Sequence, residues 1–402
     1  MRIKKIHAAC VDLAPRPTTP PRVPASAVGT TGNAAGVAAP RRFRHPVDRY
    51  PGLPHTGTGW PRVACVATAE DGTWGLGLTL HGAPVAAVIN DHFGPLLAGQ
   101  PVTATEKAWD LMHRATAPYG ASGLASYAMS AVDLALWDLK GKLLRRPVYE
   151  LLGGPQKERI FCYASNTDLS YGMEHSLEWF LELGFRAVKI FLTTGPEQNL
   201  PGLRETEDRV ARARELVGDD VELAVDAWLN PNVEYAVRLG ELLRPYRIKW
   251  LEDFLPADDL EGYAAVRSRL PGITLASGEH WYGIGSFASA VQRRLVDILQ
   301  PDLQWCGGLS NAVRICHLAD AAGLTVIAHA GMNTPFGQHL SFAMPAVQWG
   351  ERSEGVSPPG VPLQEMVYVP GTPVIRDGHL VPSDAPGFGI EATLGWLESH
   401  TL

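Results

Sequence analysis

The chain has 402 residues, a length that predicts two or three domains with a sizeable core. Hydrophobic residues make up 46% of it and charged residues 19%, which excludes an intrinsically disordered protein. The net charge of −7 argues against nucleic acid as a partner, and no long run of Lys and Arg suggests a membrane surface. The sequence also has no apolar run of about 18 residues, which a membrane-spanning helix would need.

The five cysteines form neither a CxxC pair nor a disulfide framework. We therefore expect reduced and mostly buried thiols in a cytoplasmic protein. The basic start of the chain is followed by Asp12 and several prolines before any apolar segment forms, so a signal peptide is not expected.

The N-terminal region, residues 1–155, predicts a domain of strands and helices. Residues 3–13 and 62–68 are strand-like, and helical spacing of apolar residues within 106–144 predicts a helix with one apolar face. A Pro-rich stretch, residues 15–62, shows neither the helical spacing of apolar residues nor the alternation of a strand, and it predicts a loop. Basic residues near its middle, Arg44 among them, favour a lid over an anionic small molecule, although a solvated basic loop is an equally good interpretation.

From residue 159 onward, short apolar runs alternate with helical stretches. The eight runs are residues 160–164, 187–191, 222–227, 248–251, 273–276, 296–299, 324–328 and 346–349. Strands alternating with helices predict a parallel sheet that is buried on both faces, and eight such units are typical of a (β/α)8, TIM-like barrel. We assign the barrel to residues 156–357, and we expect residues 358–402 to return to the N-terminal domain.

Three acidic residues follow three successive runs at nearly equal intervals. Asp226, Glu252 and Glu279 are 26 and 27 residues apart, which is about the length of one strand–helix unit. They should therefore meet at the carboxyl-terminal mouth of the barrel, where active sites of this fold lie. Carboxylates that converge without cations repel one another, and oxygen ligands of this kind suit Mg²⁺, or Mn²⁺ in its place. The alternative for any single acid is a solvated loop charge.

The next strand ends add an aspartate and a histidine. Asp302 and His329 follow the sixth and seventh runs, so adjacent strands should bring them together. A carboxylate that orients an imidazole makes it a competent base near neutral pH. A lone histidine here would more often be a packed or capping residue, but the pairing makes His329 the leading candidate for the base. Glu351 ends the last run and adds a further polar group at the mouth.

On the second run, Lys189 and Phe191 are two residues apart and should both face the barrel interior. Lys189 offers positive charge to an anionic substrate. Phe191 offers no base.

Several stretches of the chain resemble the enolase superfamily, specifically its mandelate racemase-like branch and the rhamnonate dehydratase-like group within it. These stretches are SAVDLALWD at 130–138, PVYELLGG at 147–154, EGY at 261–263, SGEH at 277–280 and QPDLQWCGGL at 300–309. The similarity extends over residues 125–391 and is weak in the Pro-rich loop.

The resemblance implies an N-terminal α+β capping domain, completed by the C-terminal segment, with an acid sugar bound between cap and barrel. It implies Mg²⁺ on the three strand-end acids, a base formed by Asp302 and His329, and a role for Glu351 in binding the substrate or the developing enolate. His280 resembles a residue near the substrate or metal, although it could also be structural. His55, Arg62 and Arg44 are cap candidates for substrate binding, and relatives in this branch are often dimers or octamers.

Phe191 departs from the pattern of many racemases in the branch, which carry a lysine base at this position. Racemisation needs a base on both faces of the substrate carbon, so a single base favours dehydration. We therefore expect a hydro-lyase that converts L-rhamnonate or a related aldonate into a 2-keto-3-deoxy acid. The alternatives are epimerisation, cycloisomerisation, and a barrel that binds a sugar acid without catalysis.

Overall fold

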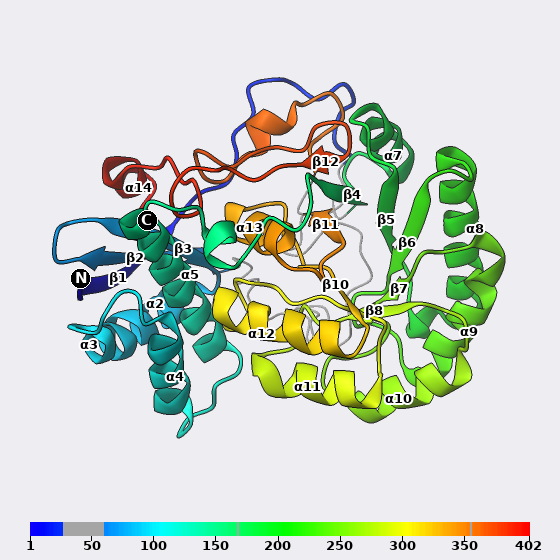
Figure 1. Cartoon of the computed structure of the whole chain (residues 1–402). Coiled ribbons are helices and arrows are strands. Elements are labelled where there is room, and N and C mark those ends of the chain that lie inside the picture. Colours follow the sequence, from blue (N-terminus) through cyan, green and yellow to red (C-terminus); the bar gives the residue numbers. More distant parts are fainter. Residues whose placement is uncertain (27–59, 167–168, 354–355) are drawn as a thin grey trace, which may run out of the picture.

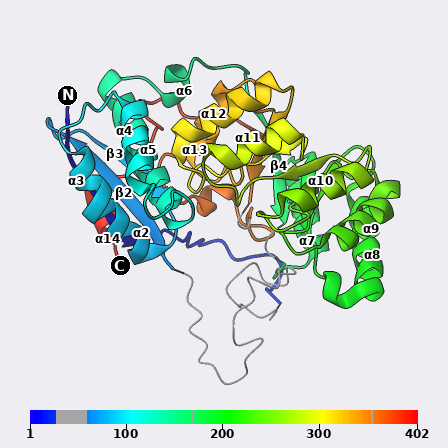
Figure 2. The ribbon, with the colours of Figure 1, turned by 90° about the horizontal axis from the view of Figure 1, so that it is seen from below.

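A parallel sheet and a smaller antiparallel sheet divide the chain into a barrel and a cap (Figure 1). The computed structural model describes residues 1–26, 60–166, 169–353 and 356–402. The fold class expected from the sequence is confirmed: an eight-stranded, TIM-like barrel carries a separate α+β cap at one side. Figure 2 shows the same two parts from below.

The cap is built on three antiparallel strands. β1 (Ile3–Val11) pairs with β2 (Arg62–Ala69), which pairs with β3 (Trp74–Thr79). Both strands expected from the sequence are therefore present. The cap helices are α2 (Gly82–Ala87), the π-helical turn η2 (Val88–Phe93), α3 (Gly94–Leu97), α4 (Thr105–Thr116), α5 (Leu124–Leu144) and α6 (Val148–Leu151).

The helical region expected at 106–144 is two helices, α4 and α5. Gly120 and Gly123, with φ of 99° and 58°, lie in the connection, because this left-handed backbone favours glycine. Instead of the single apolar face expected, α5 is buried on nearly all sides. Two glycines of β3 allow the helix to approach, and a Cβ on Gly77 would lie 1.9 Å from the carbonyl oxygen of Ala131.

The barrel strands follow one another in chain order around the sheet. They are β4 (Ile160–Asn166), β5 (Ala187–Phe191), β6 (Glu222–Asp226), β7 (Leu251–Glu252), β8 (Leu275–Ser277), β9 (Ile298–Leu299), β10 (Thr325–Val326) and β11 (Trp349–Arg352). β11 pairs with β4, and a parallel bridge between Val326 and Val347 links β10 to the chain before β11. Each of the eight apolar runs thus overlaps a barrel strand, and the ring is nearly closed.

Helices connect the barrel strands and form its outer layer (Figure 1). They are α7 (Met173–Glu182), α8 (Asn199–Val217), α9 (Val233–Leu243), α10 (Leu260–Arg269), α11 (Gly283–Arg293), α12 (Gly308–Ala321) and α13 (Pro335–Ala343), with short 3-10 turns η3 (Pro196–Gln198) and η4 (Arg244–Tyr246). Side chains cap the N-termini of α9 and α10: Asn232 accepts a hydrogen bond from the Tyr235 amide, and Asp259 accepts one from the Gly262 amide, both at 2.9 Å.

The C-terminal segment crosses from the barrel to the cap (Figure 1, orange to red). It contains the 3-10 turn η5 (Leu363–Met366), β12 (His379–Leu380), which pairs with β4, and α14 (Leu394–Ser399). The amide of Leu402 donates to the carbonyl of Cys10 at 3.0 Å, so the chain ends against β1. This segment completes the cap, as the sequence predicted.

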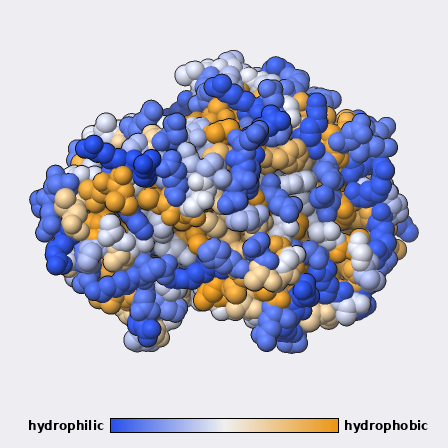
Figure 3. All heavy atoms as spheres, in the orientation of Figure 1, coloured by the Kyte–Doolittle hydropathy of each residue, from blue (hydrophilic) through white to orange (hydrophobic). Residues whose placement is uncertain are grey.

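Hydrophilic residues dominate the face of the molecule drawn in Figure 3, with apolar groups scattered among them. Among the described helices, none combines the length and apolar character needed to cross a membrane.

Candidate active site

The inside of the barrel has an apolar floor with a polar layer above it. Tyr163, Trp250 and Trp349 pack their rings together, with centroids 5.2 to 6.3 Å apart. Because residues two apart share a strand face, Lys189 lies above Ala187 on β5, and the strand-end acids of β6 and β7 follow in the same way. The alternation of each strand therefore places charge directly above the apolar floor.

The remaining strand ends supply the other polar groups from short turns. Glu279 follows β8 after Gly278, whose φ of 136° and close neighbours, Gln300 just after β9 and Phe287 on α11, favour glycine. Asp302 and His329 follow β9 and β10, whereas Glu351 lies within β11. The three acids are buried at the carboxyl-terminal end of the barrel, and the side chain of His329 is 14% exposed.

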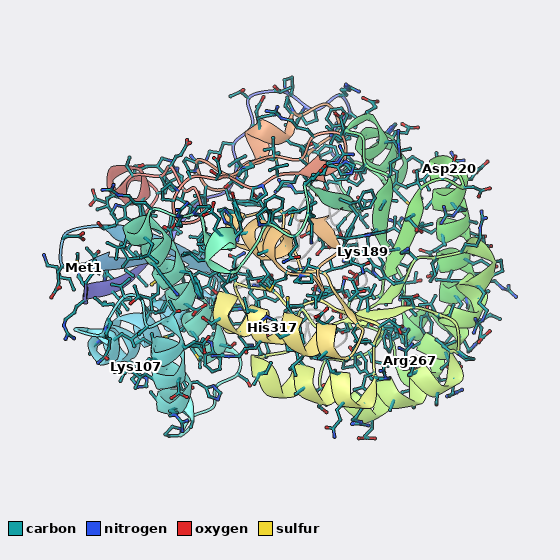
Figure 4. All side chains as sticks on the ribbon, in the orientation of Figure 1. Met1, Lys107, Lys189, Asp220, Arg267 and His317 are labelled. Carbon is teal, nitrogen blue, oxygen red and sulfur yellow. The ribbon has the colours of Figure 1, made fainter. Side chains whose placement is uncertain are left out.

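Lys189, which lies within the barrel (Figure 4), forms ion pairs with three carboxylates. Its Nζ lies 3.0 Å from Asp226 Oδ2 and 2.9 Å from Glu351 Oε1, and it also forms an ion pair with Glu252. The second oxygen of each acid has a partner as well: the Trp228 amide donates to Asp226, the Trp250 indole to Glu252 and the Ala330 amide to Glu351. Lys189 thus compensates the charge of these acids in this structure.

Glu279, the third acid of the predicted metal site, lies between two histidines. Its Oε1 is 3.0 Å from His280 Nε2, and its Oε2 is 3.0 Å from His329 Nε2. On the other side of the ring, His329 Nδ1 lies 2.8 Å from Asp302 Oδ2. The predicted pairing of Asp302 with His329 is therefore present in the structure.

Burial and charge shift the pKa values of these groups in different directions. Burial raises the pKa of Asp226 to about 6 and that of Glu252 well above its usual range, although Lys189 opposes both shifts. Burial alone would lower the pKa of His329, but the neighbouring Glu279 and Asp302 raise it well above its usual value. Burial, the largest single effect, would raise the pKa of Glu351, but Lys189, His329 and the Ala330 amide together lower it.

The charges at the mouth do not balance. Six nearly buried carboxylates meet there, and the described cationic groups in contact with them are Lys189, His280 and His329; the six acids are Asp226, Glu252, Asp253, Glu279, Asp302 and Glu351. If all six carboxyl groups were ionised, negative charge would exceed positive charge even with both imidazoles protonated; burial, together with this excess, raises the pKa values of Glu252 and Asp253. An all-oxygen set with surplus negative charge fits a hard divalent cation such as Mg²⁺.

The donor atoms themselves are engaged by Lys189 and the histidines. Over the described parts of the chain, no three His, Cys, Asp or Glu side chains are arranged to hold a metal ion. The fit to Mg²⁺ therefore rests on donor chemistry and charge.

Of the substrate-binding candidates from the cap, Arg62 is described and the other two lie outside the described residues. Arg62, at the start of β2, stacks its guanidinium 4.6 Å above the ring of Tyr368 in the C-terminal segment. His55 and Arg44, with most of the Pro-rich loop, fall within residues 27–59, outside the described residues. Before that stretch, Thr18 and Thr19 donate hydrogen bonds to Glu365.

Three further residues of the site were missed by sequence reasoning. Trp305 packs its ring 4.9 Å from His329 and 5.4 Å from His280. Buried Asp253 accepts a hydrogen bond from Ser277 at 2.5 Å, and burial raises the pKa of this acid to about 8. At the end of β4, Asn166 is buried with neither side-chain polar atom bonded to a described residue. For Trp305, its place in the stretch QPDLQWCGGL was a sequence signal of a position near the site, whereas Asp253 and Asn166 had no such signal.

A barrel whose strand ends combine carboxylates, an ammonium and an imidazole–carboxylate pair under an α+β cap defines the enolase class of proteins. Residues 173–394 match the family model "Enolase C-terminal domain-like", and residues 51–153 match "Mandelate racemase / muconate lactonizing enzyme, N-terminal domain". The chain belongs to the mandelate racemase / muconate lactonizing enzyme family of the enolase superfamily.

Known relatives of the chain include enzymes that are named for an acid sugar. It is 38% identical over 334 residues to an L-rhamnonate dehydratase of Saccharopolyspora erythraea, covering 80% of each chain. The structure of a rhamnonate dehydratase from Gibberella zeae complexed with Mg has a TM-score of 0.85 and 27% identity, covering 100% of this chain and 96% of that one. A racemase from Streptomyces coelicolor with bound magnesium has a TM-score of 0.78 and 26% identity, with both chains fully covered.

Proposed function

We propose that the chain is a Mg²⁺-dependent dehydratase of a sugar acid, with L-rhamnonate or a close stereochemical relative as substrate. The relatives support the reaction class, a hydro-lyase that acts on an acid sugar. The observation that carries the mechanism is the hydrogen-bonded pair of Asp302 and His329 beside the acids of the barrel mouth.

His329 is the proposed base. Asp302 holds Nδ1 and stabilises the imidazolium that forms, so Nε2 is the nitrogen that would take the proton from C2 of the substrate. Asp226, Glu252 and Glu279 would hold Mg²⁺. When bound, Mg²⁺ would neutralise the substrate carboxylate and so make the C2 proton more acidic.

The elimination can be completed by the same histidine. After His329 takes the C2 proton, the electron pair left on C2 forms a double bond to C3 as the C3–O bond breaks. The imidazolium gives its proton to the leaving hydroxyl, which departs as water and leaves His329 neutral again. The enol product then tautomerises to a 2-keto-3-deoxy acid.

Lys189 and Glu351 would bind and orient the substrate. Lys189 provides the buried positive charge that an anionic substrate needs. Because the pKa of Glu351 is lowered, its carboxylate is ionised and can accept a hydrogen bond from a substrate hydroxyl.

Phe191 supports elimination over racemisation. Its ring lies 5.4 Å from Lys189 Nζ and fills the second strand position facing the mouth. The position therefore has no group that could return a proton to the opposite face of C2.

The test is His329→Asn, which keeps a side chain of similar size and removes the base. With Mg²⁺ and a panel of monoacid and diacid sugars, keto-acid formation should fall by about 100-fold or more, while calorimetry should still detect Mg²⁺ binding. His317→Asn, at an exposed position on α12, is the matched control and should keep wild-type turnover.

Near-wild-type turnover of His329→Asn would show that the base is a different residue. Reaction in D₂O separates the competing chemistry, because an epimerase would introduce deuterium at C2 of recovered substrate without forming a keto acid. Turnover of diacids alone would exclude L-rhamnonate and related monoacids.

A further inference from the structure

The turn between β9 and α12 carries one half of the proposed base. Asp302 begins this turn, and its Oδ1 accepts a hydrogen bond from the Gln304 amide at 2.6 Å. Its carbonyl oxygen accepts hydrogen bonds from the amides of Trp305, at 3.0 Å, and Cys306, at 2.8 Å. The position of the Asp302 carboxylate therefore depends on the conformation of residues 302–307, which we call the dyad turn.

Five buried side chains of the cap hydrogen-bond to backbone groups of the dyad turn and of the start of α12. Each of them bonds to a barrel residue far away in the sequence. Thr79 donates to the carbonyl of Gln304 at 2.7 Å, Ser126 to that of Trp305 at 2.6 Å and Trp109 to that of Gly307 at 2.8 Å, while Ser130 accepts from the Gly307 amide at 2.9 Å and Asp133 accepts from the Ser310 amide at 2.8 Å.

Two of these contacts hold residues that themselves touch Asp302 or His329. The residue held by Thr79, Gln304, is also the one whose amide bonds to Asp302. The residue held by Ser126, Trp305, packs its ring 4.9 Å from the imidazole of His329. Each hydroxyl is fully buried and bonded to a backbone carbonyl, so its loss would leave that carbonyl without this partner.

We propose that Thr79 and Ser126 of the cap are positioning residues for the reaction, holding the dyad turn so that Asp302 and Trp305 keep the His329 ring in its productive orientation. The inference rests on the proposed function of His329 as the base. It gives the cap a role in the proton transfer itself, in addition to enclosing the substrate. α5, which carries Ser126, packs beside α12 just beyond the turn (Figure 1).

The experiment compares Thr79→Val, Ser126→Ala and their double variant with the wild type. Each single change should lower kcat by roughly 3- to 10-fold, and the double change by about 10- to 100-fold, because each removes one buried hydrogen bond. KM should stay within about two-fold, since neither side chain is proposed to contact substrate. With substrate deuterated at C2, the isotope effect on kcat should be larger in these variants than in the wild type. Thr79→Ser keeps the hydroxyl and should therefore have the turnover of the wild type.

Ser176→Ala is the matched control. Ser176 is a buried serine of α7 that donates to the carbonyl of Gly172 at 2.8 Å, away from the dyad turn. This variant should keep the wild-type kcat and isotope effect. Equal losses in Ser126→Ala and Ser176→Ala would overturn the proposal, because the effect would then be general destabilisation.

Hydrogen–deuterium exchange provides a measurement that does not depend on turnover. The amides of residues 304–306 should exchange faster in Thr79→Val and Ser126→Ala than in the wild type and Ser176→Ala. Unchanged exchange, or faster exchange with an unchanged kcat, would overturn the proposal. A wild-type protein that dehydrates no sugar acid would instead refute the proposed function, while exchange would still report whether the cap holds the turn.

Discussion

Replacing Lys189 by methionine tests how the charges of the barrel mouth are compensated. The side chain is 1% exposed and its ammonium forms ion pairs with Asp226, Glu252 and Glu351. Methionine keeps an unbranched side chain of similar length but removes the charge. The three carboxylates would then face one another without their shared cation.

The expected cost follows from burial. Removing one partner of a buried ion pair lowers the free energy of unfolding by about 3–5 kcal/mol, because an uncompensated charge stays buried. Lys249→Met is the control: Lys249 pairs with Glu222 at 2.9 Å, but both side chains are more than a third exposed. Loss of that pair should cost less than about 1 kcal/mol.

Urea unfolding with and without Mg²⁺ separates charge compensation from packing. In EDTA, the unfolding free energy of Lys189→Met should be about 3–5 kcal/mol lower than that of the wild type. A divalent cation held by the exposed acids should stabilise this variant more than the wild type, by about 2.7 kcal/mol at 100 times its Kd. The wild type should respond less, because Lys189 already occupies the same oxygens.

Two results would refute this reasoning. A cost no larger than that of Lys249→Met would mean that the acids are not charged around Lys189. An equal response of wild type and variant to Mg²⁺ would mean that the ion does not bind at these acids.

Two further predictions concern the scaffold. Burial lowers the pKa of His339 to about 3, so below pH 6.5 the unfolded state binds a proton at this histidine that the folded state does not. Between pH 6.5 and 5, the unfolding free energy measured in urea should therefore fall by about 2 kcal/mol more in the wild type than in His339→Gln. Equal losses would contradict this assignment. Gly77→Ala should lower the unfolding free energy by about 3 kcal/mol, because the new Cβ would meet the backbone of α5. Gly285→Ala, at an exposed helical position with open space around it, should raise the unfolding free energy by up to about 1 kcal/mol. Similar values for the two variants would refute the packing argument.

The barrel could be predicted because its strands are short apolar runs at regular intervals. All eight runs overlap strands, although β7, β9 and β10 contain only two residues each. Helix α5 shows the opposite case. It packs between the cap sheet and α12, so residues on every side are buried and the expected single apolar face is lost.

The polar residues at the strand ends were predictable for the same geometric reason, but their partners were not. The sequence predicted that Asp302 and His329 would meet, and they do. It predicted that Lys189 would face the mouth and offer its charge to the substrate, but not that this ammonium would lie among three acids from β6, β7 and β11. Strand order indicates which ends are adjacent, but the reach of a long flexible side chain is decided by the electrostatic balance of the whole mouth.

The cap contacts of the dyad turn are the least predictable part of the site, and the reason is chemical. A serine or threonine that donates to a backbone carbonyl leaves no pattern at the accepting residue, because every residue offers the same carbonyl group. Thr79 and Gln304 are 225 positions apart, and Ser126 and Trp305 are 179 apart. A motif can therefore reveal the residues that carry charge or take a proton, whereas the groups that orient them become visible only when the cap and the barrel are seen together.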